Sequence, residues 1–115
     1  MNHKVTYTMN LSNAVDLAKH LSCADTSFQK ALSSRVEIAL YSKKLHERAV
    51  RFEAWLCEEL IGCVACYLDS SFRHNAFVTN VSVLPKYQRL GIAERLMGAC
   101  IQNARDLRLL QINLE

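Results

Sequence analysis

The 115-residue sequence predicts a single α/β (α+β) domain built on a mixed sheet. Segments of alternating apolar residues, typical of strands, are interleaved with segments of helical spacing. In the second half of the chain, a strand pattern at 77–84 precedes an amphipathic helix pattern and a further strand pattern at 109–114. That succession is typical of a right-handed parallel crossover. The predicted element order is β-α-α-β-β-β-α-β over one domain, residues 1–115.

The first strand and helix follow from short-range patterns near the N-terminus. Residues 3–9 alternate as a half-buried strand does, and Ser12 or Asn13 can cap a helix with its side-chain oxygen. The polar stretch 22–29 predicts a loop, with a short helical turn around Lys30. The helix pattern between them rests on Ala14, Leu17, Ala18 and Leu21.

A second amphipathic helix and a hairpin come next. Glu58-Glu59 separates two strand patterns at 50–57 and 60–68, which predicts a two-residue turn. Gly62 inside the second strand indicates a bulge or a close backbone approach. The helix before the hairpin carries its apolar side on Ile38, Tyr41, Leu45 and Ala49.

The sequence Cys63-Val64-Ala65-Cys66 has the C-x-x-C spacing of metal and redox sites. It lies within the predicted strand 60–68, where residues three apart point to opposite faces. Two thiolates on opposite faces cannot share one metal ion, so core packing is the favoured interpretation and no metal site is expected.

The strand-to-helix join of residues 77–93 is the most informative stretch. Residues 77–84 are apolar at most positions of both faces, which predicts a central strand buried on both sides and ended by Pro85. A helix start leaves backbone N–H groups available to an anion, and Gly91 and Ala93 keep its approach open. The helix is predicted from its apolar stripe of Ile92, Leu96, Met97, Cys100, Ile101, Ala104 and Leu107.

Composition narrows the class of protein. Half of the residues are hydrophobic, with one proline and three glycines, which excludes a disordered chain. The net charge of +3 is spread along the sequence, so nucleic acid is not an expected partner. No apolar run approaches 18 residues, so no membrane association is expected. Five cysteines without framework spacing fit a reducing compartment, and the predicted location is the cytoplasm.

The run V-x-V-x-P-x-Y-Q-R-x-G-I-A at 81–93 resembles the acetyl-CoA-binding core of the GNAT N-acetyltransferases, whose signature is Q/R-x-x-G-x-G/A. Gln88, Gly91 and Ala93 fill the first, fourth and sixth positions. The element order also resembles the GNAT-like acyl-CoA N-acyltransferase fold. The family normally continues with a fourth helix and two more strands, whereas this sequence stops after the fifth strand, at Glu115.

The resemblance implies acetyl-CoA as co-substrate and implies where it binds. The backbone of Val81, Ser82 and Val83 would pair with the pantetheine arm and polarise the thioester carbonyl, and N–H groups of 89–93 would hold the pyrophosphate. Lys86, Arg89 or Arg95 would meet the 3′-phosphate. The predicted cofactor-binding residues are Val81, Ser82, Val83, Gln88, Arg89, Leu90, Gly91, Ile92 and Ala93.

The sequence does not identify the catalytic base or acid. Family members with a carboxylate facing the acetyl group would place it near Thr79 or Asn80, and neither side chain can act as a base. The remaining candidates near the sheet are Glu53, Tyr67 and His74. Each has an ordinary alternative, namely a solvent-facing strand residue, a packed aromatic and a loop residue. The tyrosine that commonly protonates the thiolate lies on the family's fourth helix.

The resemblance therefore implies an N-acetyltransferase that acts on a primary amine of a small molecule or peptide. Two alternatives stay open, a CoA-binding or regulatory module that has lost catalysis and a structural dimerising domain of the same fold. The last strand would leave an unpaired edge with an apolar face, which predicts a homodimer sealed near 109–115.

Overall fold

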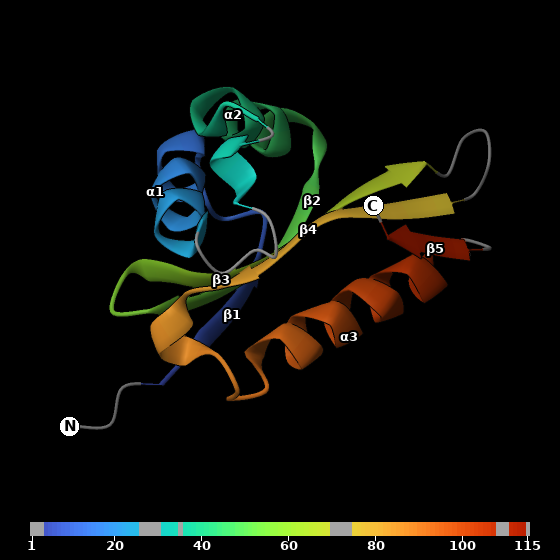
Figure 1. Cartoon of the computed structure of the whole chain (residues 1–115). Helices are drawn as coiled ribbons and strands as arrows, with labels where there is room; N and C mark the ends of the chain where they lie inside the picture. The colour runs from blue at the N-terminus through green and yellow to red at the C-terminus, as the bar shows by residue number, and fades with distance from the viewer. Residues whose placement is uncertain (1–3, 26–30, 35, 70–74, 108–110, 115) are drawn as a thin grey trace.

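The predicted order of strands and helices is confirmed by a computed structural model, which describes residues 4–25, 31–34, 36–69, 75–107 and 111–114 (Figure 1). The elements are β1 (Thr6–Met9), α1 (Ala14–Ala24), α2 (Ile38–Arg48), β2 (Val50–Leu56), β3 (Glu59–Asp69), β4 (Asn75–Val83), α3 (Ile92–Asp106) and β5 (Gln111–Leu114), with short 3₁₀ turns at Leu32–Ser34 and Pro85–Tyr87.

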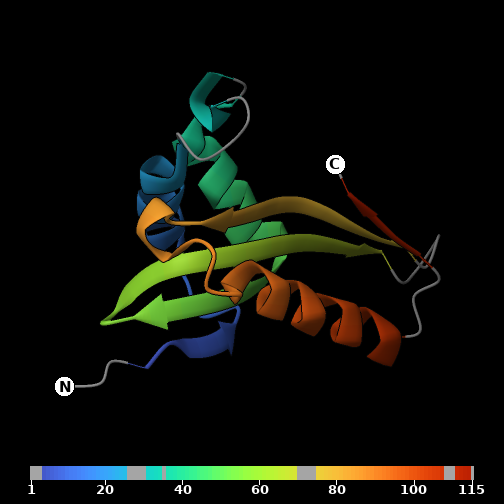
Figure 2. The same cartoon turned by 60° about the horizontal axis from the view of Figure 1, so that its bottom comes forward.

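The five strands form one sheet in the order β1-β2-β3-β4-β5. The first four are antiparallel to their neighbours, and β5 is parallel to β4, as the predicted crossover requires. Helices α1 and α2 cover one face of the sheet and α3 covers the other (Figures 1 and 2). Among the described residues, no helix is both long and apolar enough to cross a membrane.

Each face of the sheet has its own apolar core. Cys63 packs with α1 and α2, whereas Cys66 packs with α3, so the two cysteines do point to opposite faces as predicted. Burial raises the pKa of the Cys63 thiol to about 12, which keeps it protonated and unreactive. The α1/α2 core consists of Leu17, Leu21, Leu32, Leu45, Ala49, Leu60, Cys63 and Ala65.

Helix α1 begins as predicted and ends later than predicted. Asn13 caps it, and the expected loop at 22–29 is wrong in its first part because the helix continues to Ala24. Leu21 and Ala24 are fully buried, so the tertiary packing extends the helix through a polar stretch of sequence. Lys30, where a helical turn was expected, lies outside the described residues.

The hairpin turn lies one residue earlier than the sequence suggests. β2 and β3 pair at Leu56 and Glu59, so Cys57 and Glu58 form the turn and Glu59 belongs to β3. Both turn residues have positive φ, 50° and 65°, the backbone geometry of a type I′ hairpin. The position of the turn was mispredicted because neither Cys57 nor Glu58 is the Gly or Asn that this turn favours.

Gly62 serves both of the purposes expected of it. The β2–β3 register shifts next to it, leaving Ile61 opposite the step from Ala54 to Trp55. A Cβ atom at Gly62 would lie 2.9 Å from Ile92 Cγ2 and 3.2 Å from Leu96 Cδ1. The missing side chain therefore lets α3 pack directly on β3.

β4 is buried on both sides at most positions, as expected for 77–84, but its side-chain alternation is interrupted and one face is polar. Its pairing with β3 shifts at Thr79, so Thr79 is a β-bulge. A one-residue shift reverses the side-chain alternation. Val81 and Val83 consequently face the α3 side, whereas Asn80 and Ser82 face α1 as buried polar residues. Val81 is 40% exposed, which contradicts its expected burial.

The apolar stripe of α3 is confirmed at Ile92, Leu96, Cys100 and Ala104, which are all buried. Leu107, expected to extend it, follows the end of the helix and is 46% exposed. β5 is Gln111–Leu114, and residues 109 and 110 of the expected last strand lie outside the described part of the chain.

Candidate functional site: a groove between β4 and α3

The second half of β4 runs beyond its parallel partner. Among the described residues, β5 pairs with Asn75–Val78, and β4 continues from there to Val83. Leu84 N–H donates to Ile61 O of β3 at 2.9 Å. Because backbone groups alternate along an antiparallel strand, Val81 and Val83 direct their N–H and C=O groups to the opposite edge. That edge is the one from which an extended ligand could pair with β4.

A tight connection follows the strand. Pro85–Tyr87 forms a 3₁₀ turn in which Tyr87 N–H donates to Leu84 O at 2.9 Å. The Gln88 side chain then reaches back, its Nε2 donating to Val83 O at 3.0 Å. Gln88 was predicted to contact the cofactor. In the structure its amide nitrogen holds the loop against the end of β4.

The start of α3 is uncapped. Its N-cap residue is Gly91, whose φ of 80° is left-handed and which has no side chain to accept a hydrogen bond. The first intrahelical bond is Arg95 N–H to Gly91 O at 3.1 Å, so the N–H groups of residues 92–94 cannot be satisfied inside the helix. A Cβ atom at Gly91 would meet no atom within 4 Å.

These elements enclose a groove of about 340 Å³. All of the predicted cofactor-binding residues line it except Leu90, whose side chain is 69% exposed. Tyr87 and Glu94 also line the groove and were missed, although their places beside Gln88 and Ala93 could have indicated them. The lining residues are Val81, Ser82, Val83, Tyr87, Gln88, Arg89, Gly91, Ile92, Ala93 and Glu94.

Three cations were candidates for a phosphate contact, and the structure separates them. Arg95 stacks on Tyr7 of β1, with its guanidinium carbon 4.1 Å from the ring centroid. Lys86 Nζ lies 5.7 Å from the centroid of Tyr87. Arg89 lines the groove itself, in a left-handed conformation with φ of 66°. Of the three, Arg89 is the one that lines the groove.

Glu53, the first catalytic candidate, is fully buried, so the alternative of a solvent-facing residue is wrong. Its carboxylate accepts hydrogen bonds from Thr8 Oγ1 at 3.0 Å and from Leu11 N–H at 2.7 Å. Ser12 donates to it from both backbone and hydroxyl, and Arg51 Nε lies 3.4 Å from Oε2. With its lone pairs engaged, Glu53 anchors the β1–α1 connection to β2.

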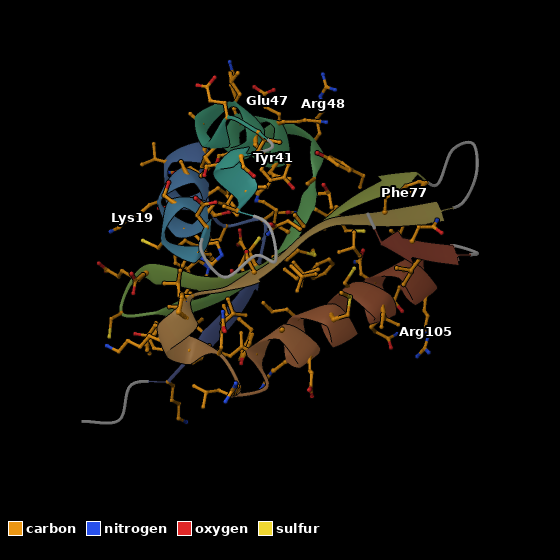
Figure 3. The ribbon with its side chains drawn as sticks, viewed as in Figure 1. Lys19, Tyr41, Glu47, Arg48, Phe77 and Arg105 are labelled. Atoms are coloured by element: carbon orange, nitrogen blue, oxygen red, sulfur yellow. The ribbon has the colours of Figure 1, made fainter. Side chains whose placement is uncertain are left out.

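Of the other two catalytic candidates, Tyr67 is described by the structure and is not among the residues that line the groove. Tyr67 packs against the α1/α2 core, with Lys44 Nζ 5.5 Å from its ring centroid. Tyr41 extends from α2 to the bulge of β4, where its hydroxyl lies 3.0 Å from Thr79 O (Figure 3). His74 lies outside the described residues.

A buried polar cluster on the α1 side of β4 was not predicted. His20 of α1 is 2% exposed, with Nδ1 lying 2.8 Å from Leu60 O and Nε2 lying 2.8 Å from Ser82 Oγ. Asn80 Nδ2 donates to the same Ser82 hydroxyl at 2.9 Å. Burial holds the pKa of His20 below its usual value. The helical position of His20 beside Leu17 and Leu21 was the only signal in the sequence.

Comparison with known proteins places this geometry in context. The model of the acetyltransferase (GNAT) family matches residues 14–115 of the chain. Among curated proteins, no sequence matches it significantly.

Solved structures share the fold at low identity. A ribosomal-protein-alanine N-acetyltransferase from Brucella melitensis biovar Abortus 2308 is 18% identical, with 97% of this chain and 80% of that chain covered and a TM-score of 0.73. An aminoglycoside N-acetyltransferase in complex with CoA is 12% identical, with 100% and 78% covered and a TM-score of 0.69. An aminoglycoside acetyltransferase from an uncultured soil metagenomic sample, in complex with sisomicin, is 17% identical, with 96% and 76% covered and a TM-score of 0.69.

Proposed function

The chain belongs to the GNAT acetyltransferase family, and on that premise we propose that it transfers an acetyl group from acetyl-CoA to a primary amine. The observation that carries the proposal is the groove of about 340 Å³ in which the open edge of β4 meets the uncapped start of α3. The two parts of the groove suit the two chemical parts of acetyl-CoA.

The start of α3 suits the pyrophosphate. N–H groups of residues 92–94 point out of the helix end, and the helix dipole adds partial positive charge there. The absence of a side chain at Gly91 leaves the space that an anion needs, since a Cβ atom there would meet nothing within 4 Å. Arg89 adds a full charge beside these groups.

The edge of β4 suits the pantetheine arm, which carries amide groups able to pair as an added strand does. Val83 directs its N–H and C=O groups to this edge. The Val83 carbonyl already accepts a hydrogen bond from the Gln88 side chain, so the Val83 N–H is the group proposed to pair with the ligand. Val81 presents both N–H and C=O to that edge, as the alternation of the strand dictates. Pairing there would fix the thioester beside Ser82 and orient its carbonyl for attack.

The acceptor is proposed from chemistry shared by the structural neighbours. One neighbour is named for acetylation of an alanine of a ribosomal protein and others for aminoglycosides. Both classes present a primary amine. We therefore propose a primary amine on a peptide or a small polar molecule as the acceptor, with the protein as an enzyme rather than a binding module.

The test has two stages. CoA should raise the melting temperature, because a ligand at about 100 times its Kd adds about 2.7 kcal/mol to the free energy of unfolding. Acetyl-CoA is then supplied with an alanine-terminated peptide or sisomicin, and release of the thiol is followed. If calorimetry shows no heat of binding and melting shows no thermal shift at millimolar CoA, the proposal is refuted. Binding without any transfer would favour the regulatory module instead. A duplex DNA should give no comparable shift.

Two further expectations stay predictions. β5 is the edge strand of the described sheet, and the homodimer expected there is tested by light scattering at micromolar protein. The cytoplasmic location is tested by fractionation.

A further inference from the structure

The cluster of His20, Ser82 and Asn80 has a fixed direction of hydrogen bonding. Leu60 O can only accept, so the His20 nitrogen 2.8 Å away, Nδ1, carries a proton. In a neutral imidazole Nε2 is then an acceptor, so the Ser82 hydroxyl donates to it. Asn80 Nδ2 donates to Ser82 Oγ from the other side. The Ser82 oxygen therefore keeps one lone pair unused by these bonds.

His20 is placed to receive a proton. Burial lowers its pKa, so the imidazole is neutral at physiological pH and Nε2 has a lone pair to offer. Asp16, Lys19 and Cys23 from α1 and Glu58 and Glu59 from the hairpin line a small cavity of about 50 Å³ beside it. The charge of Glu59 raises the pKa of His20, against the larger effect of burial, so an imidazolium there would be partly stabilised.

Ser82 connects this buried histidine to the groove. It lines the groove together with Val81 and Val83, whose backbone edge faces the same space. The bulge at Thr79 is what turns Ser82 toward α1. A hydroxyl bonded to a neutral histidine that is oriented by a carbonyl has the arrangement of an activated proton acceptor.

We propose that Ser82 and His20 form a proton relay for the acetyl transfer, an inference that rests on the proposed function. Ser82 Oγ accepts the proton that leaves the attacking amine, and the Ser82 hydroxyl proton passes to His20 Nε2. The nitrogen lone pair forms the new bond to the acetyl carbon, and the carbon–sulfur bond breaks to release the CoA thiolate. The imidazolium returns its proton through Ser82 to the thiolate or to water. Asn80 positions the Ser82 oxygen.

The test uses two variants and a matched control in the full chain. His20→Gln keeps a side-chain acceptor for Ser82 and cannot take up a proton. Ser82→Ala removes the hydroxyl and nothing else. Ser42→Ala removes a fully buried hydroxyl from α2, away from the groove, and controls for the loss of a buried polar group. Thermal melting establishes that each variant is folded.

Transfer is measured with acetyl-CoA and the better of two probes, an alanine-terminated peptide and sisomicin, or by hydrolysis with water as acceptor if neither turns over. We expect kcat to fall at least about 100-fold in His20→Gln and in Ser82→Ala, as for the loss of general base catalysis. The Kd for CoA should change less than about threefold, since the backbone contacts remain. Ser42→Ala should keep the wild-type kcat.

The pH profile separates the relay from a structural role. Because burial lowers the pKa of His20, its imidazole gains a proton only at a pH below that at which an ordinary histidine does, and there the wild-type rate should fall more steeply than protonation of the acceptor alone explains. That extra fall should vanish in His20→Gln, although all five titratable neighbours of the small cavity remain. An unchanged profile, a kcat within threefold of wild type, or an equal loss of kcat in Ser42→Ala would overturn the relay. Absence of CoA binding by the wild-type protein would instead overturn the proposed function, and the relay with it.

Discussion

The first turns of α1 and α3 differ in whether a side chain accepts a hydrogen bond from their backbone N–H groups. At α1, Asn13 Oδ1 accepts from Asp16 N–H at 2.8 Å and Asp16 Oδ2 accepts from Asn13 N–H at 3.0 Å, a reciprocal capping box. At α3, the N-cap is Gly91, in a left-handed conformation that brings no side chain. Both helices expose the same dipole. The difference in one side chain therefore decides whether the third N–H group of the helix has a partner within the chain or is left facing a groove.

The acidic residues of the two turns sharpen the contrast. Asp16 is part of the capping box, whereas Glu94 lines the groove.

Gly91→Val should have the largest effect, lowering CoA affinity by about 100-fold because the new side chain would fill the space beside the N–H groups. The substitution should also lower the free energy of unfolding by about 1–2 kcal/mol, because valine is strained at the left-handed φ of 80° that Gly91 adopts. Calorimetry with CoA measures the first and urea unfolding the second. Gly98→Val, on the same helix where a Cβ meets nothing within 4 Å, is the control and should bind as wild type. If Gly91→Val and Gly98→Val bind CoA with equal affinity, then this loop does not bind the pyrophosphate.

Asn13→Ala tests the other turn. Loss of the capping oxygen should lower the free energy of unfolding by about 1 kcal/mol, since Asp16 N–H loses its partner. CoA affinity should stay at the wild-type value, because Asn13 is not among the residues that line the groove. Urea unfolding and calorimetry on the same sample check both statements. A weakened CoA complex would show that the two turns are not independent.

Arg89→Gln should weaken CoA by about threefold to tenfold at low salt and by less at high salt, because a screened point charge is lost. Arg105→Gln, at the far end of α3 in Figure 3, is matched in charge and should change little. Titrations at two salt concentrations make the comparison. If both variants lose the same affinity, then the net charge of the protein matters rather than Arg89.

Glu94→Gln should have the smallest effect. Removing a negative charge from the groove should strengthen CoA binding by about twofold, and the gain should shrink as salt rises. The corresponding Asp16→Asn change should leave binding unaltered and lower stability. Weaker binding in Glu94→Gln would mean that its carboxylate contacts the ligand through a hydrogen bond.

The contrast also explains what the sequence could predict. The groove was predictable because its strand, turn and helix are consecutive, and Pro85, Gly91 and the stripe of α3 report their geometry locally. Leu90 was the exception among its residues, since a consecutive run in a loop does not fix which side chain turns outward.

The His20 cluster could not be predicted in the same way. His20 and Ser82 are 62 residues apart, and they meet because the bulge at Thr79 reverses the alternation of β4. A strict period of two places Ser82 on the α3 side with Val78. Glu53 was misjudged for a related reason, because its partners come from the distant β1–α1 connection, which a charge pattern within β2 does not reveal.

The backbone amides of the two helix starts can be followed by ¹H–¹⁵N NMR while CoA is titrated into the wild-type protein. The amides of residues 92–94 and of Val81 and Val83 should shift with a common Kd, because they are the groups that bind. Those of residues 13–16 should not move, since α1 does not line the groove and the capping box already engages the N–H groups of Asn13 and Asp16. Shifts confined to residues 13–16, or absent from 92–94 at saturating CoA, would contradict the claim that the uncapped start of α3 holds the ligand.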